Sequence, residues 1–461
     1  IISSNFYKEI NINKENGFKK KEDAQKLIGQ LGTPHSEAMP HDETVSPGDD
    51  VQTKDAAQDT AVVESIECKK ENKNPPLLYN LAELQNDCSK LFKISPDETL
   101  RIVQELYERK MVTYPRTDAR VLSTAVAKEI HKNIGGLKNY APAGNFAAEI
   151  LSQGSYKNIA KTRYVNDKQI TDHYAIIPTG QGLNNLGGLP PTSVKGYEVI
   201  ARRFLSIFYP AAVYRKFALT VKVGTESFFA NFKVLAEEGY LKVMDYSFKK
   251  SGESRQEPSA KRQDDPDADN KEASGSGNEE TEEKCDAEMV ALLMKLKKGD
   301  TLSVKGYEIK EGETSPPKRY TSGSIILTME NAGQFIEDEE LRAQIKGSGI
   351  GTSATRAEIL KKLINIEYLA LNKKTQILTP TLMGEMIYDV VAASIKPLLN
   401  PALTASWEKG LSQVAEGQIT SAEYMGKLDD FVTRRTNIVK QLNNQGSLFH
   451  LFREAEANYK K

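Results

Sequence analysis

The chain has 461 residues, 39% of them hydrophobic and 27% charged, which is typical of a globular protein with roughly three domains. No run approaches the ~20 apolar residues that span a membrane. The three cysteines, Cys68, Cys88 and Cys285, lie far apart and form no CxxC pair. Neither a disulfide framework nor a zinc ribbon is therefore expected, and a reducing, cytoplasmic location fits.

Charge is distributed unevenly along the chain. Nine acidic residues and one base, Lys271, lie between Asp264 and Glu283, which gives this stretch a local charge of −8. Since the whole chain carries −1, the remainder carries −1 − (−8) = +7. A mildly basic remainder permits binding to nucleic acid without proving it.

In chain order, the first residues predict short elements around a polar loop. The expected elements are a strand at 5–12, a helix at 21–31, loop or disorder at 33–60 and a strand at 61–66. Helices are expected at 77–91, from Ser95 onward and at 123–133. The Ser95 helix has the clearest start, because a serine cap is followed by Pro96 and Glu98.

The second half of the chain changes from strand to helix. Alternating apolar residues predict a β-hairpin from 217–223 and 228–234 that turns at Gly224. Residues 249–283 are charged and poor in apolar side chains, so we expect disorder there. Strand character resumes at 303–309, which indicates that the insert interrupts one β domain, and from 324 onward the pattern is mainly helical.

Tyr114, Pro115 and Arg116 form the motif with the clearest chemistry. Proline fixes φ and favours extended geometry in the residue before it, so we expect Tyr114 at the end of a helix and not inside one. A free phenol, with a pKa near ~10, is a poor nucleophile at pH 7, but a nearby guanidinium favours the phenolate and can bind a phosphate. The motif therefore suits covalent catalysis at a phosphodiester. Tyr-Pro also occurs at exposed turns, and Arg-Thr-Asp can simply begin a helix.

Two further segments carry candidate phosphate contacts. His173, one of five histidines, lies in 170–179; a histidine beside apolar residues is more often structural, but an imidazole can also contact phosphate or relay a proton. Arg319 stands between Lys318 and Tyr320, and basic residues beside an aromatic are used in single-strand grooves for phosphate contact and base stacking. Taken alone, that segment is equally compatible with a surface loop.

Residues 346–358, KGSGIGTSATRAE, are rich in glycine but do not fit a nucleotide loop. No lysine follows the last glycine, as a P-loop requires, so we expect no ATP site. Glycines let backbone N–H groups approach an anion, and Thr355 and Glu358 are spaced as a capping box that opens a helix carrying Arg356. Thr355 and Arg356 are candidate phosphate contacts; the alternative is an ordinary capped helix. The helix and two strand-like segments that follow predict a winged-helix-like unit.

Together these segments resemble type IA DNA topoisomerases, specifically the topoisomerase III branch. The resemblance runs in order from near residue 1 to about residue 435. It rests on 75–81, 106–118, 170–179, 316–321, 349–357, Leu378–Thr381 with Gly384, and Trp407–Glu408 with Leu411 and Gly417. The family usually has serine where this chain has Ala119, which removes one polar contact and leaves Tyr114 and Arg116 in place.

The resemblance implies an α+β multidomain fold, in which a toroid of helical domains is joined by a β-rich arch. The expected parts are the first part of the arch at 1–74, a helical catalytic-tyrosine domain at 75–205, the second part of the arch at 206–320 with a disordered acidic insert at 249–285, and a helical, winged-helix-like DNA-binding domain at 321–461.

It also implies a reaction without ATP. Tyr114 would cleave single-stranded DNA through a 5′-phosphotyrosine, the other strand would pass, and religation would complete relaxation or decatenation. Arg116 would stabilise the charge that develops on the phosphorus. His173, Arg319, Thr355 and Arg356 would bind the DNA.

The family uses Mg²⁺ through an N-terminal metal-binding (Toprim) domain, which has a catalytic Glu and an Asp-x-Asp-x-Glu cluster. The comparable string, Asp265, Asp267 and Asp269, lies in the insert expected to be disordered, and we do not take it as a metal site. The chain opens at Ile1 without a methionine. We therefore expect a fragment without that domain, which has no metal ligands of its own and cleaves poorly alone.

The expected partner is DNA, mainly single-stranded, bound by a monomer without a membrane or a nucleotide. A tyrosine recombinase or relaxase is disfavoured, because a relaxase needs a histidine-triad metal site that five scattered histidines do not supply. A noncatalytic single-strand-binding protein derived from a topoisomerase stays open as the alternative.

Overall fold

A computed structural model of the chain describes residues 2–3, 9–10, 18, 20–31, 60–249, 287–313, 316–345 and 349–459. The expected loop at 33–60, apart from its last residue, the acidic insert at 249–285, apart from its first residue, and most of the expected strand at 5–12 lie outside these residues. The chain divides into two compact units. As far as they are described, the sheet unit is Ile1–Asn74, Pro210–Gly239 and Arg262–Pro316, and the helical unit is Pro75–Tyr209, Tyr240–Lys261 and Pro317–Lys461.

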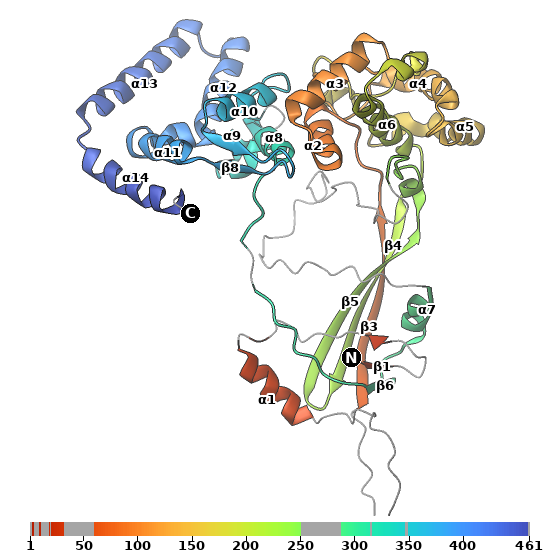
Figure 1. The fold of residues 1–461 in the computed structure, drawn as a ribbon. Coiled ribbons are helices and arrows are strands. Elements are labelled where there is room, and N and C mark those ends of the chain that lie inside the picture. The colour runs from red at the N-terminus through yellow and green to blue at the C-terminus, as the bar shows by residue number, and fades with distance from the viewer. Residues whose placement is uncertain are drawn as a thin grey trace, which may run out of the picture. The chain divides into compact units, whose positions relative to one another are not determined.

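The sheet unit contains an antiparallel sheet in the order β2-β1-β6-β3-β4-β5. Its elements are β1 (Ile2–Ser3), β2 (Glu9–Ile10), α1 (Lys21–Leu31), β3 (Thr60–Lys73), β4 (Ala212–Val223), β5 (Glu226–Glu237), α7 (Ala287–Lys295) and β6 (Thr301–Val304). Figure 1 shows β3, β4 and β5 as long strands side by side.

The expected hairpin is confirmed in this sheet, and the strand expected at 303–309 is present but shorter, at Thr301–Val304. β4 and β5 pair with Val221 opposite Phe228, and Gly224 turns the chain at a φ of 59°, which a glycine adopts without steric cost. Every second residue of this part of β4 is buried, namely Phe217, Leu219 and Val221. They share one hydrophobic cluster with Leu302 of β6. Because β6 pairs with β3, the chain that follows the acidic insert rejoins the same sheet.

The helical unit is built mainly of helices. They are α2 (Leu81–Phe92), α3 (Pro96–Glu108), α4 (Thr124–Gly136), α5 (Gly144–Gln153), α6 (Pro191–Ser206), α8 (Ser322–Glu330), α9 (Glu339–Ile345), α10 (Arg356–Asn365), α11 (Leu382–Ser394), α12 (Pro401–Ala415), α13 (Ser421–Gln441) and α14 (Gln445–Tyr459). A small hairpin, β7 (Leu369–Leu371) and β8 (Leu378–Pro380), follows α10 directly. Short 3₁₀ helices lie at Leu137–Asn139, Ser155–Lys161, Asp167–Gln169, Leu183–Gly188, Gly239–Lys242, Ala332–Phe335 and Lys396–Leu399.

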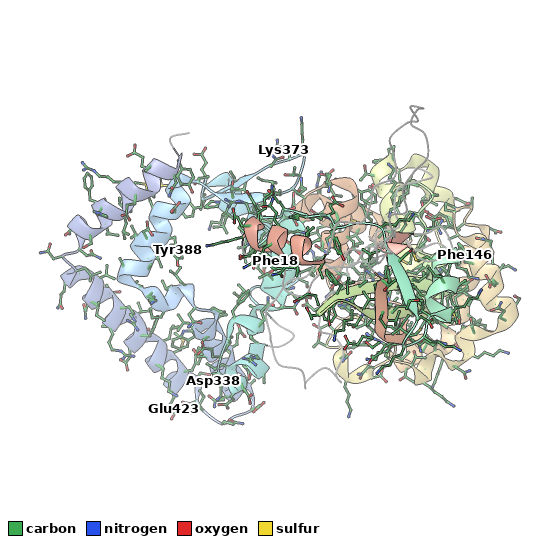
Figure 2. All side chains as sticks on the ribbon, turned by 90° about the horizontal axis from the view of Figure 1, so that it is seen from below. Phe18, Phe146, Asp338, Lys373, Tyr388 and Glu423 are labelled. Atoms are coloured by element: carbon green, nitrogen blue, oxygen red, sulfur yellow. The ribbon has the colours of Figure 1, made fainter. Side chains whose placement is uncertain are left out.

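The last helices of this unit are thinly packed. Neither α11 nor α13 has a fully buried residue. Tyr388 of α11 is 57% exposed, and Figure 2 shows its side chain standing out from the ribbon. The buried core of the unit lies instead among α2 to α6 and α8, where α2 packs closely on α8.

Two helix starts show how local sequence acts. The predicted start at Ser95 is confirmed, because its Oγ accepts the N–H of Glu98 at 3.2 Å and Pro96 occupies the first turn. The helix expected from 77 begins only at Leu81. Residues 78–80 are extended, with Leu78 N–H donating to the Arg120 carbonyl at 3.2 Å. Asn80 then caps the helix, since its Oδ1 accepts the N–H of Glu83 at 2.9 Å.

Residues 240–249 were expected to belong to the arch, but they pack within the helical unit. Ser247 donates from its N–H and its Oγ to the two carboxylate oxygens of Glu198, at 2.7 and 2.5 Å. Arg202 donates to the Val243 carbonyl at 2.9 Å and pairs with Glu198 at 2.6 Å. Of the arch expected at 206–320, the described residues 206–209, 240–249 and 317–320 therefore belong to the helical unit, and buried partners on α6 hold the second of these segments there.

A buried ion pair lies under the first helices of this unit. Arg203, 3% exposed, donates to Asp87 Oδ2 at 3.0 Å, and its guanidinium carbon lies 4.2 Å from the centre of the Tyr79 ring. The Tyr79 hydroxyl donates to the same carboxylate oxygen at 2.7 Å. Burial raises the pKa of Tyr79 well above its usual value, so this hydroxyl stays protonated and remains a donor.

We predict that Asp87→Asn lowers the free energy of unfolding by about 3–5 kcal/mol, because it leaves the buried Arg203 cation without its counter-charge. The measurement is urea unfolding followed by circular dichroism. Glu129→Gln is the matched control: Glu129 pairs with Lys132 on the surface, where solvent screens the charges, so the same change should cost far less. Equal losses in the two variants would contradict the assignment.

Candidate active site

The turn that ends α3 delivers Tyr114. Lys110 N–H donates to the Tyr107 carbonyl at 2.8 Å and Met111 N–H donates to the Leu106 carbonyl at 2.9 Å, the two bonds of a Schellman motif. This motif requires a left-handed residue, and Lys110 adopts it with a φ of 61°. A side chain other than glycine in this conformation costs about 1 kcal/mol. Tyr114 follows just beyond the helix, as its proline neighbour predicted.

A second segment pairs with the tyrosine segment and brings His173 to it. Thr113 N–H donates to the Ile177 carbonyl at 3.0 Å, and Thr179 N–H donates to the Met111 carbonyl at 2.9 Å, an antiparallel arrangement. The Thr117 hydroxyl donates to the His173 carbonyl at 2.8 Å. The two residues singled out for phosphate chemistry are therefore brought together by backbone pairing between segments far apart in the sequence.

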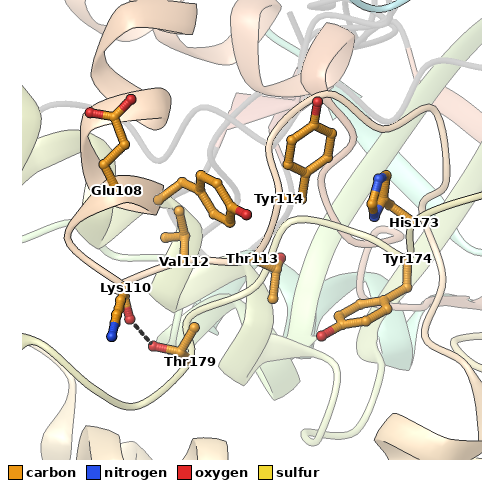
Figure 3. A pocket seen from close by; sticks show the side chains of 9 residues that line it. Glu108, Lys110, Val112, Thr113, Tyr114, His173, Tyr174 and Thr179 are labelled. Carbon is orange, nitrogen blue, oxygen red and sulfur yellow. Dashed lines mark hydrogen bonds between the residues drawn. The ribbon is translucent and has the colours of Figure 1, made fainter.

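Tyr114 lies between two other rings. Its ring centre is 4.3 Å from that of His173, with 39° between the planes, and 5.5 Å from that of Tyr107, which meets it edge-on at 85°. Figure 3 shows the His173 ring beside that of Tyr114, with the tyrosine hydroxyl at the free end of the side chain. Tyr114 is half-buried and His173 is exposed, so both can be reached from solvent.

An open pocket of about 560 Å³ adjoins the tyrosine. It is lined by Tyr107, Glu108, Lys110, Val112, Thr113, Tyr114, His173, Tyr174 and Thr179 (Figure 3). The lining combines three phenol rings and an imidazole with one cation and one carboxylate. Aromatic faces beside a cation are what an unstacked nucleotide needs.

Arg116 is exposed, and no described residue hydrogen-bonds to it or forms an ion pair with it. Its five N–H donors are thus available to an anion that enters from solvent. Arg116 follows Tyr114 by two residues in the sequence and is not among the residues that line the pocket.

Arg356 lies in the opposite environment. It is 1% exposed, and its Nη1 donates to Asp118 Oδ1 at 2.9 Å and lies 3.9 Å from Glu330 Oε1. Its Nε also donates to the Ile350 carbonyl at 3.3 Å. The guanidinium therefore joins the first turn of α10 to the tyrosine segment and is not presented to solvent.

The capping box predicted for Thr355 and Glu358 is wrong. Thr355 has helical dihedral angles, φ −105° and ψ −23°, and its hydroxyl makes no cap bond to the helix. Instead the Thr355 Oγ1 accepts the N–H of Thr352 at 2.9 Å, because a turn at 352–355 leads directly into α10. Thr355 itself is exposed.

In its described part, the glycine-rich segment before α10 forms backbone hydrogen bonds within the protein. Residues 346–348 lie outside the described residues, whereas Gly349 and Gly351 have φ values of 66° and 67°. The N–H groups of Gly349 and Ile350 donate to the carbonyls of Ile345 and Met329 at 3.0 and 2.8 Å, so they are engaged within the protein.

Arg319 lies apart from the pocket, next to the small hairpin. It is exposed, and the carbonyl of its neighbour Tyr320 accepts the N–H of Leu378 at the start of β8. Burial raises the pKa of Tyr459 at the end of α14, and the positive charge of Arg319 opposes this rise. The order α10, β7, β8 is the helix-and-hairpin arrangement expected of a winged-helix-like unit.

Two residues that complete the Arg356 cluster were missed by the sequence reading. Asn80 Nδ2 donates to Glu330 Oε1 at 2.6 Å and to the Asp118 carbonyl at 3.1 Å. The pKa of Glu330 is raised to about 7, chiefly by burial and also by the charges of Asp118 and Glu83, while Arg356 and Arg120 oppose the rise. The only sequence signal for Asn80 was its preference as a helix cap, and an acid at the end of the apolar helix α8 gave no signal of its own.

The described residues do not fit a Mg²⁺ site. Among them, no group of three or more His, Cys, Asp or Glu side chains is placed to hold a metal ion. Two acids of the Arg356 cluster, Asp118 and Glu330, are already engaged by Arg356 and Asn80. Within the described part of the chain, no helix is long and apolar enough to cross a membrane.

We predict that Glu330→Gln removes a pH dependence of stability. The folded pKa of about 7 exceeds the ordinary value of 4.5, so the unfolded state releases this proton first and stability falls as pH rises from 4.5 to 7. The amide keeps the bond from Asn80, so at pH 8 the variant should be more stable than the parent by up to about 3 kcal/mol. Urea unfolding midpoints from pH 4.5 to 8.5 test this, with Glu358→Gln at an exposed site of α10 as control; parallel curves for Glu330→Gln and the parent would contradict it.

Comparison with known proteins places this geometry in a family. The family model described as DNA topoisomerase matches residues 4–426. A DNA topoisomerase 3 of Bacillus licheniformis is 33% identical over 374 residues, covering 80% of this chain and 46% of the relative. A DNA topoisomerase 3 of Bacillus subtilis is 33% identical over 395 residues, covering 84% and 48%.

The fold has a solved neighbour as well. The full-length topoisomerase I from Thermotoga maritima aligns with a TM-score of 0.56 and 19% identity, over 92% of this chain and 56% of that chain. This similarity confirms the expected α+β multidomain class. The chain spans about half the length of the curated relatives it matches. Since the family match covers residues 4–426, which is nearly all of the chain and includes the tyrosine motif, the chain belongs to the type IA DNA topoisomerases.

Proposed function

We propose that this chain carries the cleavage chemistry of an ATP-independent topoisomerase of the topoisomerase III branch and acts as a monomer on single-stranded DNA. The observation that carries the proposal is the placement of Tyr114. Its hydroxyl end is accessible, its ring lies 4.3 Å from that of His173, and an unpaired Arg116 follows two residues later. Relatives named DNA topoisomerase 3 support the choice of branch.

The proposed step is an in-line exchange of one ester for another. The Tyr114 oxygen forms a bond to phosphorus, the bond from phosphorus to the 3′ oxygen breaks, the phenol loses its proton and the 3′ oxygen gains one. The product is a 5′-phosphotyrosine and a free 3′ hydroxyl. Because one phosphodiester replaces another, religation is the same exchange in reverse and needs no ATP. A second strand passes while the break is open, which relaxes or decatenates DNA.

The protein groups act on charge and on the proton. Arg116 lies where it can stabilise the negative charge on the non-bridging oxygens as the phosphorus becomes five-coordinate. His173, against the tyrosine ring, is assigned to phosphate contact or to proton relay. Arg319 and Thr355 are exposed and are assigned to the bound strand, whereas the buried Arg356 is assigned to holding Asp118.

The family relation implies Mg²⁺, and we propose that its ligands lie outside the described residues. The chemistry proposed is that of Tyr114 and its neighbours, because the alignments cover 46% and 48% of the two relatives.

We predict that the chain forms a covalent adduct at the 5′ end of cleaved DNA and that Tyr114→Phe abolishes it, because the phenylalanine lacks the attacking oxygen. The measurement uses 5′- and 3′-labelled single-stranded oligonucleotides with Mg²⁺, protease digestion and denaturing electrophoresis. If the chain alone gives no adduct, the metal-binding domain of a related topoisomerase is added. Binding of DNA without any adduct in either mixture would overturn the proposal and favour a noncatalytic single-strand-binding protein.

We predict that Arg116→Ala slows adduct formation by roughly 10²- to 10³-fold, the usual effect of removing one donor to a developing oxyanion. The slope of log affinity against log salt for single-stranded DNA should fall by about 0.7, since one phosphate contact is lost. Arg101→Ala is the matched control, because Arg101 is exposed on α3 and lies outside the segment that contains Tyr114. Equal effects of the two changes on the cleavage rate would remove Arg116 from the site.

A further inference from the structure

Two residues that line the pocket beside Tyr114 have no part in the proposed exchange: Tyr107 and Lys110. Lys110 occupies the one left-handed position of the turn after α3, where the backbone alone would favour glycine. Lys110 is exposed, and no described residue forms an ion pair with it. A cation in a strained conformation at the rim of a pocket points to a role in binding.

Tyr107 contributes an aromatic surface to the same pocket. It is 38% exposed although it belongs to the last turn of α3, and it meets the Tyr114 ring edge-on at 5.5 Å. An edge-on contact occupies the rim of one ring and leaves room for a second ring to stack on a face. The pocket volume of about 560 Å³ lies in the range of small-molecule sites and accommodates one nucleotide.

The charges around the pocket decide which part of a nucleotide enters it. Glu108, exposed at the lining, would repel a phosphate and can accept hydrogen bonds from the amino group of a base. Its Oε1 already accepts one bond, from Gln104 at 3.1 Å, and its other oxygen is left for a ligand. Lys110 supplies the positive charge for a phosphate, and the Thr179 hydroxyl, which donates to the Lys110 carbonyl at 2.5 Å, holds that turn in place.

We propose that this pocket is a subsite for the nucleotide whose 5′-phosphate becomes joined to Tyr114, with Tyr107 stacking on its base and Lys110 pairing with the next phosphate along the strand. The inference rests on the proposed function, because it takes the attack by Tyr114 as its reference point. The subsite retains the downstream end of the broken strand by noncovalent contacts that are independent of the phosphotyrosine bond. A base held on an aromatic face binds with little regard to sequence, since every base has such a face.

The first test detects stacking without cleavage. In the Tyr114→Phe chain, 2-aminopurine is placed in turn at each position of a short single-stranded oligonucleotide. We expect its fluorescence to be quenched at one position on binding, the quenching to persist in Tyr107→Phe, which keeps the ring, and to disappear in Tyr107→Leu with a loss of affinity of about tenfold. The quenched position should be the one directly 3′ of the bond that the parent chain cleaves. Equal quenching in the Phe and Leu variants at every position would overturn the proposal.

The second test separates the charge of Lys110 from its backbone. Lys110→Gly relieves the left-handed strain and removes the cation, so thermal stability should hold or rise while affinity for single-stranded DNA falls about threefold and the salt slope falls by about 0.7. Lys93→Gly is the matched control: Lys93 is also exposed and left-handed, with a φ of 56°, but it lies after α2 and does not line the pocket. It should show the same change in stability with unchanged affinity.

Equal losses of affinity in the two lysine variants, or none in Lys110→Gly, would show that the pocket is not a nucleotide subsite. Both tests read binding and not cleavage. Absence of an adduct both from the chain alone and after addition of the metal-binding domain would therefore refute the proposed function while leaving the result for the pocket readable. A chain that forms the adduct but shows no stacking on Tyr107 would refute only the subsite.

Discussion

The buried guanidinium of Arg356 is the constraint on which the tyrosine segment depends. A cation that is 1% exposed must have its charge compensated nearby, and Asp118 provides that compensation at 2.9 Å, while Glu330, whose pKa is raised to about 7, lies 3.9 Å away. Asp118 belongs to the tyrosine segment, Glu330 ends α8 and Arg356 opens α10. Because Asn80 bonds to both Glu330 and the Asp118 backbone, four separate parts of the chain meet at one charge.

Arg116 and Arg356, both predicted from the sequence to contact phosphate, lie in opposite environments. Arg116 is exposed, and no described residue pairs with it, whereas the charge of Arg356 is used inside the fold. Arg116 can therefore bind a phosphate that arrives from solvent, whereas Arg356 holds in place the segment that contains Arg116. A site that stabilises charge on a substrate needs both kinds of residue, because an unpaired cation acts only if its backbone is held in place.

The ring arrangement at Tyr114 depends on backbone pairing between two extended segments. The bonds between Thr113 and Ile177, and between Thr179 and Met111, set the register that places His173 against the tyrosine. A shift of one residue in this pairing would turn the imidazole to the other side. Beneath these segments, Tyr79 accepts the N–H of Ile176 through its carbonyl and uses its hydroxyl for the buried carboxylate of Asp87, which anchors the pair to the helical core.

Much of the architecture could be predicted from local patterns. Ser95 and Pro96 start α3 where expected, Tyr114 follows its end, β4 and β5 form the predicted hairpin, and β6 rejoins the sheet after the acidic insert. These features depend on capping, on dihedral preferences and on a repeat of two or 3.6 residues, all of which act over a few positions. The family resemblance rests on the same short motifs and was confirmed by the family match.

What no local pattern carries is which distant groups meet. The contact of Tyr114 with His173, the burial of Arg356 and the packing of residues 240–249 on α6 all join segments separated by long stretches of chain. The missing cap at Thr355 has the same origin, since its hydroxyl took a partner in the preceding turn. Spacing along the chain sets which side chains share a face of a helix or strand. Only the packed structure decides which charged groups are buried away from water and must therefore pair with one another.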